Sequence, residues 1–270
     1  MAASGRYARG SVLNKMMSTM KQMDYSATNS RSAYTLVVFA LVAVVGLAGC
    51  TGKKTAVKDF DTAGTKDSTA ANVKKGIKPV PDADVAVIET ADYGNIVVEL
   101  YPNIAPKMVG RFKKLIGEGF YNGTTFHRVN AASGLIQGGD PLSKDNDPTN
   151  DGTGDSPYPN VPAEFSDLHF ERGTVGAARR GAAPADGNHA ALTDEQARDT
   201  ANCQFFITLK QQPEFDEDYT VFGEVIQGIN NADVIMRAPV ADESERPEEK
   251  IVIKNITLQP RVRYVPQTNP

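Results

Sequence analysis

The residues best suited to bind a metal ion do not form a metal-binding pattern. The chain has three histidines, which are His127, His169 and His189. Their spacing matches no metal site, and two cysteines are too few for a four-cysteine zinc site. An acidic stretch within residues 141–162 fits a calcium loop poorly, because position twelve counted from Asp147 is Tyr158 and not Glu. The sequence favours a solvated acidic loop over a calcium site, and it predicts neither a metal nor a cofactor.

Five short motifs carry the other residues that could do chemistry. They are Phe126-His-Arg-Val129, Ile136-Gln-Gly-Gly-Asp140, Pro162-Ala-Glu-Phe165, Asn202-Cys-Gln-Phe-Phe-Ile207 and Tyr219-Thr-Val-Phe-Gly-Glu-Val225. In this order and at these intervals they resemble the cyclophilin-type peptidyl-prolyl cis/trans isomerases. The resemblance covers essentially all of residues 84–263, and the agreement of five separate motifs makes it specific.

The resemblance implies a reaction in which no covalent bond breaks. Rotation about an X–Pro bond meets a barrier of about 18–20 kcal/mol that amide resonance sets. The site needs neither a nucleophile nor a proton shuttle, but it must bind the twisted amide more tightly than either planar form. In the twisted amide the prolyl nitrogen regains a lone pair, which a fixed guanidinium can stabilise. The arginine that the family uses for this purpose matches Arg128.

The resemblance assigns the remaining site residues as well. Gln137 matches the glutamine that holds the carbonyl before the proline. Phe206, Leu135 and Phe215 match the apolar pocket for the proline ring, and we expect Phe205 to face the core because adjacent strand residues point to opposite sides. Four further residues are predicted to contact the substrate, and these are Ala178, Arg179, Gln204 and Tyr219. His127 is interpreted as structural.

Several departures from the family pattern affect the proline pocket. An aromatic residue that normally lines it falls at Ser133 or Gly134, because the loop before Leu135 is one residue longer than usual. The chain has no Trp, and Glu214 stands roughly where the family has one. Arg179 replaces an Asn that contacts the substrate backbone. These departures leave open a second hypothesis, a catalytically weak or inactive module that binds proline peptides.

The spacing of apolar residues predicts a mainly β domain. Val85–Thr90 and Asn95–Leu100 flank a turn and predict a hairpin. Further strands are expected at 125–129, 135–137, 174–178, 204–209, 220–226 and 250–258, and helices from Pro106 to about Glu118 and at Ile229–Met236. Many short strands with two helices predict a closed antiparallel barrel, which the resemblance specifies as eight-stranded and capped by two helices.

Two insertions stand out within this domain. Residues 140–162 contain the acidic loop, and residues 181–199 are predicted to rim the substrate groove and to influence what flanks the proline. A third hypothesis is a membrane-anchored protein whose insertions bind a specific partner.

The N-terminal residues 1–49 are predicted to be a lipoprotein signal peptide. No charged residue lies between Arg31 and Lys53, and residues 34–49 are nearly all apolar. This run falls between the length of a signal-peptide core and that of a spanning helix. It ends in Leu47-Ala-Gly-Cys50, which resembles the lipobox of bacterial lipoproteins, so we expect lipidation and cleavage at Cys50. The alternative is an uncleaved membrane anchor.

Residues 50–83 are predicted to be a flexible tether, because they contain too few large apolar residues to offset the entropy of ordering. The tether carries a net charge of +3 and residues 84–270 one of −11. An acidic domain repels phosphate backbones, so no nucleic-acid partner is expected. The compact domain is predicted over residues 84–263, with a C-terminal tail over 264–270.

These features together predict a monomeric peptidyl-prolyl isomerase in the bacterial cell envelope. It would be lipid-anchored through Cys50, exposed outside the cytoplasm, and would act on proline-containing polypeptides during the folding of envelope or secreted proteins.

Overall fold

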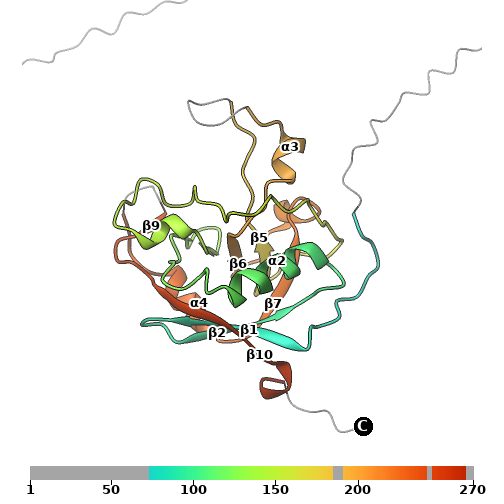
Figure 1. Ribbon diagram of the computed structural model, residues 1–270, viewed down its shortest axis with the longest axis horizontal. Coiled ribbons are helices and arrows are strands. Elements are labelled where there is room, and N and C mark those ends of the chain that lie inside the picture. Colours follow the sequence, from blue (N-terminus) through green and yellow to red (C-terminus); the bar gives the residue numbers. More distant parts are fainter. Residues whose placement is uncertain (1–72, 185–190, 242–244, 266–270) are drawn as a thin grey trace, which may run out of the picture. The chain divides into compact units, whose positions relative to one another are not determined.

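The computed structural model of the chain describes residues 73–184, 191–241 and 245–265 (Figure 1). The predicted signal peptide, Cys50 and most of the predicted tether lie outside these residues. Among the described helices, none is both long enough and apolar enough to cross a membrane.

Eight strands form one antiparallel sheet in the order β10-β1-β2-β7-β5-β6-β4-β3. They are β1 (Asp84–Thr90), β2 (Asn95–Leu100), β3 (Arg128–Asn130), β4 (Leu135–Gly138), β5 (Thr174–Ala177), β6 (Phe205–Thr208), β7 (Val221–Gln227) and β10 (Ile253–Pro260). A separate two-stranded ladder pairs β8 (Val240–Ala241) with β9 (Arg246–Pro247), and the sequence did not predict it. The mainly β class and the eight antiparallel strands are confirmed.

The prediction that the barrel closes is not confirmed. The strand order is open, with β10 at one end and β3 at the other. Between these ends lies only an isolated bridge from Thr125 to Val252, flanked by backbone hydrogen bonds such as Phe126 N–H to Ile251 O at 2.9 Å. The physical reason is the late start of β3. The sequence predicts a strand from Thr125, but regular pairing begins only at Arg128. The strand β3 therefore has only three residues, which are too few to form a continuous ladder with β10.

Both predicted helices are confirmed, and a third is present that was not expected. α2 (Pro106–Gly117) begins with proline at its first turn, and α4 (Ile229–Met236) has the predicted bounds. The short helix α3 (Asp194–Arg198) lies in the second insertion, away from the sheet (Figure 1). Its capping box between Thr193 and Gln196 is a signal that the sequence interpretation overlooked. The described residues also form 3₁₀ turns at η1 (Pro141–Lys144), η2 (Pro213–Phe215) and η4 (Arg261–Arg263).

The main hydrophobic core lies on one side of β6. The Phe112 ring on α2 packs within 5.3–5.5 Å of the rings of Tyr121, Phe205 and Phe222, in tilted and edge-to-face arrangements. Phe205 is fully buried in this core, whereas its neighbour Phe206 belongs to a separate group of apolar side chains. The two adjacent phenylalanines therefore divide as predicted, one toward the core and one toward the candidate site.

Residues at both ends of the described chain also contact the domain. Lys74 N–H donates to Phe165 O at 2.9 Å, and the Lys113 ammonium pairs with Asp82 at 2.9 Å. At the other end Tyr264 packs against a small cluster on β1 and β2. Parts of the predicted tether and tail thus lie against the folded domain.

Candidate active site

Three predicted catalytic residues lie in one row across the sheet. Arg128 on β3 is paired with Gln137 on β4, and Gln137 is paired with Phe206 on β6. The row continues to Gly176 on β5. Paired residues of neighbouring strands project to the same face, so strand register alone brings together residues that are up to 78 positions apart in the chain.

A chain of hydrogen bonds orients the polar side chains of this row. Arg128 Nη1 lies 3.4 Å from Gln137 Oε1, and Gln137 Nε2 donates to Gln204 Oε1 at 3.0 Å. Gln204 in turn donates to the carbonyl oxygens of Gly152 and Gly154, at 3.0 and 2.9 Å. The first insertion therefore sets the orientation of Gln204, and through it the orientation of Gln137. The Arg128 side chain is 46% exposed, so a peptide can reach it.

The predicted wall of the proline pocket is a second group of packed side chains, which we call the apolar cluster. Its buried members are Leu135, Phe170, Phe206 and Val221, and Leu168, Ala178, Phe215 and Tyr219 pack against them. The Phe215 and Tyr219 rings lie 5.6 and 5.5 Å from the Phe206 ring, nearly perpendicular to it. The structure thus brings Leu135 and Phe215 together with Phe206, the three residues that the resemblance assigns to the pocket, and it places Ala178 and Tyr219 against the same cluster.

Phe170 is a member of this cluster that sequence reasoning missed. Its ring is fully buried and stacks on the Phe206 ring, with 5.5 Å between centroids and an interplanar angle of 22°. The loop around Ser133–Gly134, where the family's aromatic residue is missing, is held by Lys210, whose Nζ donates to Ala131 O at 2.8 Å. The only signal for Phe170 was an isolated aromatic residue between polar neighbours, just before β5.

The Arg179 side chain packs over the ring of Tyr219 and pairs with Asp218. Its Nη2 contacts Asp218 Oδ2 at 2.5 Å, its guanidinium lies 4.4 Å from the centre of the Tyr219 ring, and only 11% of the side chain is exposed. The guanidinium is therefore neutralised by Asp218 and supports one wall of the apolar cluster. Like Gln204, Arg179 is a predicted substrate contact whose side chain is held by protein partners.

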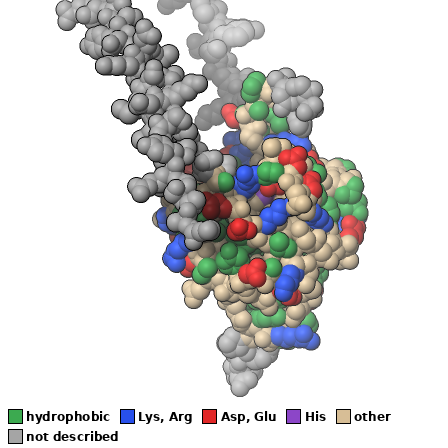
Figure 2. All heavy atoms as spheres, turned by 90° about the vertical axis from the view of Figure 1, so that its left-hand side faces the viewer, with side chains coloured by type: hydrophobic (Ala, Val, Ile, Leu, Met, Phe, Trp, Pro, Cys, Tyr) green, Lys and Arg blue, Asp and Glu red, His purple; other side chains and the backbone are tan. Residues whose placement is uncertain are grey.

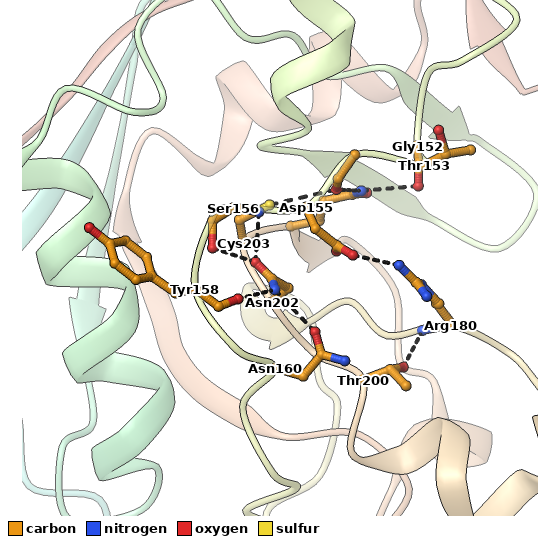
Figure 3. A network of polar contacts seen from close by, with 12 residues as sticks. Gly152, Thr153, Asp155, Ser156, Tyr158, Asn160, Arg180, Thr200, Asn202 and Cys203 are labelled. Carbon is orange, nitrogen blue, oxygen red and sulfur yellow. Dashed lines mark hydrogen bonds and ion pairs between the residues drawn. The ribbon is translucent and has the colours of Figure 1, made fainter. Parts of the chain in front are cut away.

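A cavity of about 350 Å³ adjoins this row, and we call it the insertion cavity. Gly152, Thr153 and Asp155 of the first insertion line it, as do Gly181, Ala183 and Leu192 of the second, with Gln137, Ala178 and Gln204 shared with the candidate site. Arg180 and Asp155 form an ion pair of 2.5 Å beside the cavity (Figure 3). The cavity is thus continuous with the row that holds Arg128.

Asn202 anchors the first insertion at the base of this cavity. Its Oδ1 accepts hydrogen bonds from the backbone N–H and the hydroxyl of Ser156, at 2.8 and 2.5 Å (Figure 3). Its Nδ2 donates to Tyr158 O and Asn160 Oδ1, both at 3.0 Å. One buried amide therefore uses all of its hydrogen-bonding groups to hold residues 156–160.

Two titratable side chains near the site are buried, and burial shifts the pKa of each. Burial raises the pKa of the Cys203 thiol to about 12, so it stays protonated. Burial also lowers the pKa of His127 below its ordinary value of 6.5, although Asp140 partly opposes this shift. His127 lines a different cavity, of about 220 Å³, between residues 146–151 and 246–250.

Two acidic residues of the first insertion, Asp145 and Asp147, accept hydrogen bonds within their own loop. Asp145 Oδ1 accepts from Asp147 N–H at 2.7 Å, and Asp147 Oδ1 accepts from the Thr149 hydroxyl at 2.6 Å. In the described part of the chain, no three His, Cys, Asp or Glu side chains are grouped so that they could hold a metal ion. The site consists of a guanidinium, amide groups and an apolar surface.

A family model described as cyclophilin type peptidyl-prolyl cis-trans isomerase/CLD matches residues 85–258. A relative from Brucella suis biovar 1, named "Probable peptidyl-prolyl cis-trans isomerase", is 37% identical over 177 residues, which cover 64% of this chain and 82% of the relative. A relative from Gallus gallus, named "Peptidyl-prolyl cis-trans isomerase-like 3", is 34% identical over 176 residues, covering 64% of this chain and 96% of the relative.

Solved structures are similar too. A crystal structure of a Cryptosporidium parvum cyclophilin type peptidyl-prolyl cis-trans isomerase matches with a TM-score of 0.53 and 29% identity, over 69% of this chain and 99% of that chain. A structure of the same protein in the presence of the dipeptide Ala-Pro matches with a TM-score of 0.52 and 28% identity, over 65% of this chain and 98% of that chain.

Proposed function

The chain belongs to the cyclophilin-type peptidyl-prolyl cis-trans isomerases, and we propose that it performs this reaction at the row formed by Arg128, Gln137 and Phe206. The observation that carries the proposal is the register of β3, β4 and β6. It sets a solvent-accessible guanidinium beside an oriented amide and a buried aromatic ring, which are the three groups that the reaction requires.

The geometry supports a division of roles along the X–Pro bond. The proline ring packs on the apolar cluster, where Phe206, Leu135 and Phe215 exclude water from it. Gln137 holds the carbonyl before the proline, and Gln204 fixes the orientation of its amide. Arg128 donates toward the prolyl nitrogen, whose lone pair appears only when the amide twists. Because this interaction is absent in both planar forms, it lowers the barrier and does not merely tighten binding.

The stacked pair of Phe170 and Phe206 favours an active enzyme over the inactive binding module. The second hypothesis arose from the aromatic residue missing at Ser133–Gly134. Phe170 supports Phe206 from inside the cluster, so the ring that contacts the proline is held although that residue is absent. A rigid wall is what orientation of the substrate requires.

The test is to express the chain from residue 50 onward and to measure isomerisation of a short Xaa-Pro peptide by NMR exchange. We expect exchange well above the uncatalysed rate, which has a time constant of about tens of seconds. Arg128→Ala should reduce catalysis by at least about 100-fold while the peptide still binds. Equal and background rates for both proteins would leave only the binding module.

We further propose that the protein is lipid-anchored through Cys50 in the bacterial cell envelope and assists the folding of envelope or secreted proteins there. The apolar run 34–49, the Leu47-Ala-Gly-Cys50 motif and the polar residues after it support this proposal. Mass spectrometry of the native N-terminus should find Cys50 as the first residue, carrying acyl chains. An unmodified chain that still begins upstream of residue 34 would refute it.

A further inference from the structure

The carboxylate of Glu245 contacts the candidate catalytic arginine directly. Arg128 Nε donates to Glu245 Oε2 at 2.5 Å. Glu245 lies immediately before β9, 117 positions from Arg128 in the chain, and none of the five sequence motifs includes it. Any role of this contact in the reaction rests on the catalytic role proposed for Arg128.

The second carboxylate oxygen of Glu245 is also engaged. Oε1 accepts a hydrogen bond from Asn130 Nδ2. Asn130 cannot reverse its amide, because its Oδ1 accepts from Ser133 N–H at 2.8 Å. Glu245 therefore faces a donor on each side, Arg128 Nε–H and Asn130 Nδ2–H. Only a carboxylate offers an acceptor to both, whereas a glutamine would present its NH₂ group to one of them.

The backbone of Glu245 is held at the same place. Its carbonyl oxygen accepts from Val129 N–H at 2.7 Å, on the open edge of β3. Its φ angle is 57°, in the left-handed region that side chains other than glycine, Asn and Asp seldom adopt. A residue keeps this conformation only when its surroundings determine it, and here three hydrogen bonds to β3 and its two terminal side chains do so.

The contact with Glu245 uses one edge of the planar guanidinium and leaves N–H groups on another edge available to the substrate. Glu245 takes Nε–H and Gln137 lies beside Nη1, whereas Nη2 makes no hydrogen bond with a described residue. The guanidinium is planar and its donors have a fixed geometry. Holding Nε therefore fixes the direction in which the Nη groups point.

We propose that Glu245 is a positioning residue for the isomerase reaction, which orients the Arg128 guanidinium so that its Nη groups meet the twisted prolyl amide. Positioning acts mainly on the transition state, because the lone pair that Arg128 recognises is absent from the planar substrate. The structure thereby assigns a function to Glu245, which lies outside the five motifs found in the sequence.

The experiment compares the chain from residue 50 onward with its Glu245→Gln variant, by NMR exchange at several peptide concentrations. We expect kcat to fall by roughly 10- to 100-fold, as small misplacements of catalytic groups do, with KM nearly unchanged. Glu249→Gln is the matched control. It removes the same charge two residues after β9, and the Glu249 carboxylate has no hydrogen bond or ion pair with a described residue. Its kcat should equal that of the parent protein.

A second arm shows whether Glu245 acts through Arg128. In an Arg128→Ala background Glu245→Gln should have no further effect on kcat. In the parent protein the Arg128 Nε–H resonance should be sharp and protected from solvent exchange, and it should lose this protection in Glu245→Gln. Glu245→Asp, which keeps the charge but is one methylene shorter, covers the case in which Glu245→Gln fails to fold, and we expect it to show the same loss of kcat.

The inference and the proposed function can fail separately. An unchanged or increased kcat in both folded Glu245 variants would overturn the positioning role, even if Arg128→Ala abolishes activity. A full loss from Glu245→Gln in the Arg128→Ala background would also overturn it. Absence of activity in the parent protein would instead refute the proposed function itself.

Discussion

Two neighbours, the large Phe170 and the small Gly176, fix the position of the Phe206 ring. Phe170 stacks on one face of its ring, and Gly176, its partner on β5, has no side chain to occupy the space that the ring fills. A Cβ atom at Gly176 would lie 2.3 Å from Phe206 Cζ and 2.8 Å from Phe170 Cε1. The stacked arrangement of Phe170 and Phe206 therefore requires a residue without a Cβ atom at position 176.

Gly176→Ala should consequently damage both stability and activity. The two ring atoms belong to buried side chains that cannot move without disturbing the cluster, so we expect the free energy of unfolding to fall by about 1–3 kcal/mol. Displacement of Phe206 should lower kcat/KM in the same variant. Urea denaturation and NMR exchange measure the two effects.

Gly110→Ala is the control for this substitution. Gly110 lies inside α2, and a Cβ there would meet no atom within 4 Å. Alanine should raise the stability by about 0.5–1 kcal/mol through its helix propensity and leave the activity unchanged. Wild-type stability and activity in Gly176→Ala would show that Phe206 is not held in the way described.

At the scale of elements, Asp216 joins the segment that carries Phe170 to η2, which carries Phe215. Asp216 Oδ2 lies 2.6 Å from His169 Nδ1, and Asp216 Oδ1 accepts from Phe170 N–H at 2.8 Å. One carboxylate thus connects two walls of the apolar cluster. The hydrogen bond to Asp216 raises the pKa of His169 above its ordinary value of 6.5.

This contact predicts a pH dependence of stability. A histidine whose pKa is higher in the folded state stabilises the fold fully below its unfolded pKa, and the contribution disappears as pH rises through the folded pKa. His169→Gln should therefore lower the urea midpoint at about pH 5 and have little effect at about pH 9. An NMR titration of the His169 ring checks the pKa directly. An equal loss at both pH values would contradict the charged interaction.

The first insertion depends on Asn202 in a comparable way. Asn202→Ala removes four hydrogen bonds and leaves the Ser156 N–H buried without a partner, which should cost about 1–3 kcal/mol of stability. Because residues 152–155 line the insertion cavity, kcat/KM should also change more for peptides that differ before the proline than for those that differ after it. Asn146→Ala, at an exposed residue of the same loop with no hydrogen bond to a described residue, should change neither.

At the scale of the whole molecule, the sheet depends on its last strand. β10 pairs with β1 along its length, and Ile253 N–H donates to Thr124 O at 2.8 Å across the seam near β3. Within the described residues, all eight strands of this sheet and the hydrophobic core beneath it lie between residues 73 and 265. Acidic and basic side chains are interspersed on the face that Figure 2 shows.

A chain of residues 73–265 should therefore fold and act independently. We expect its melting temperature to lie within about 3 °C of that of the chain from residue 50 onward, with equal isomerase activity. A version that ends at residue 250 lacks β10 and should not give a cooperative unfolding transition. If the 73–265 chain aggregated or lost activity, the preceding residues would have to be part of the folded unit.

Short stretches of the sequence predict several helices and strands of this protein and the family to which it belongs. Pro106 and the apolar spacing after it predict α2. β-Branched runs on either side of a turn predict β1 and β2, and alternation predicts β10. The motifs around Arg128, Gln137 and Phe206 identify the family. These features depend on neighbouring residues or on short patterns, which sequence alone displays.

The tertiary structure decided what depends on residues that are distant in the chain. Phe170 lies 36 positions from Phe206 and Glu245 lies 117 from Arg128, so no local pattern connects either pair. The open end of the sheet at β3 likewise results from where pairing begins and not from the strand propensity of Thr125–His127. Strand register and the path of the chain after α4 set these contacts, because burial and hydrogen bonding are satisfied only when the whole sheet has assembled.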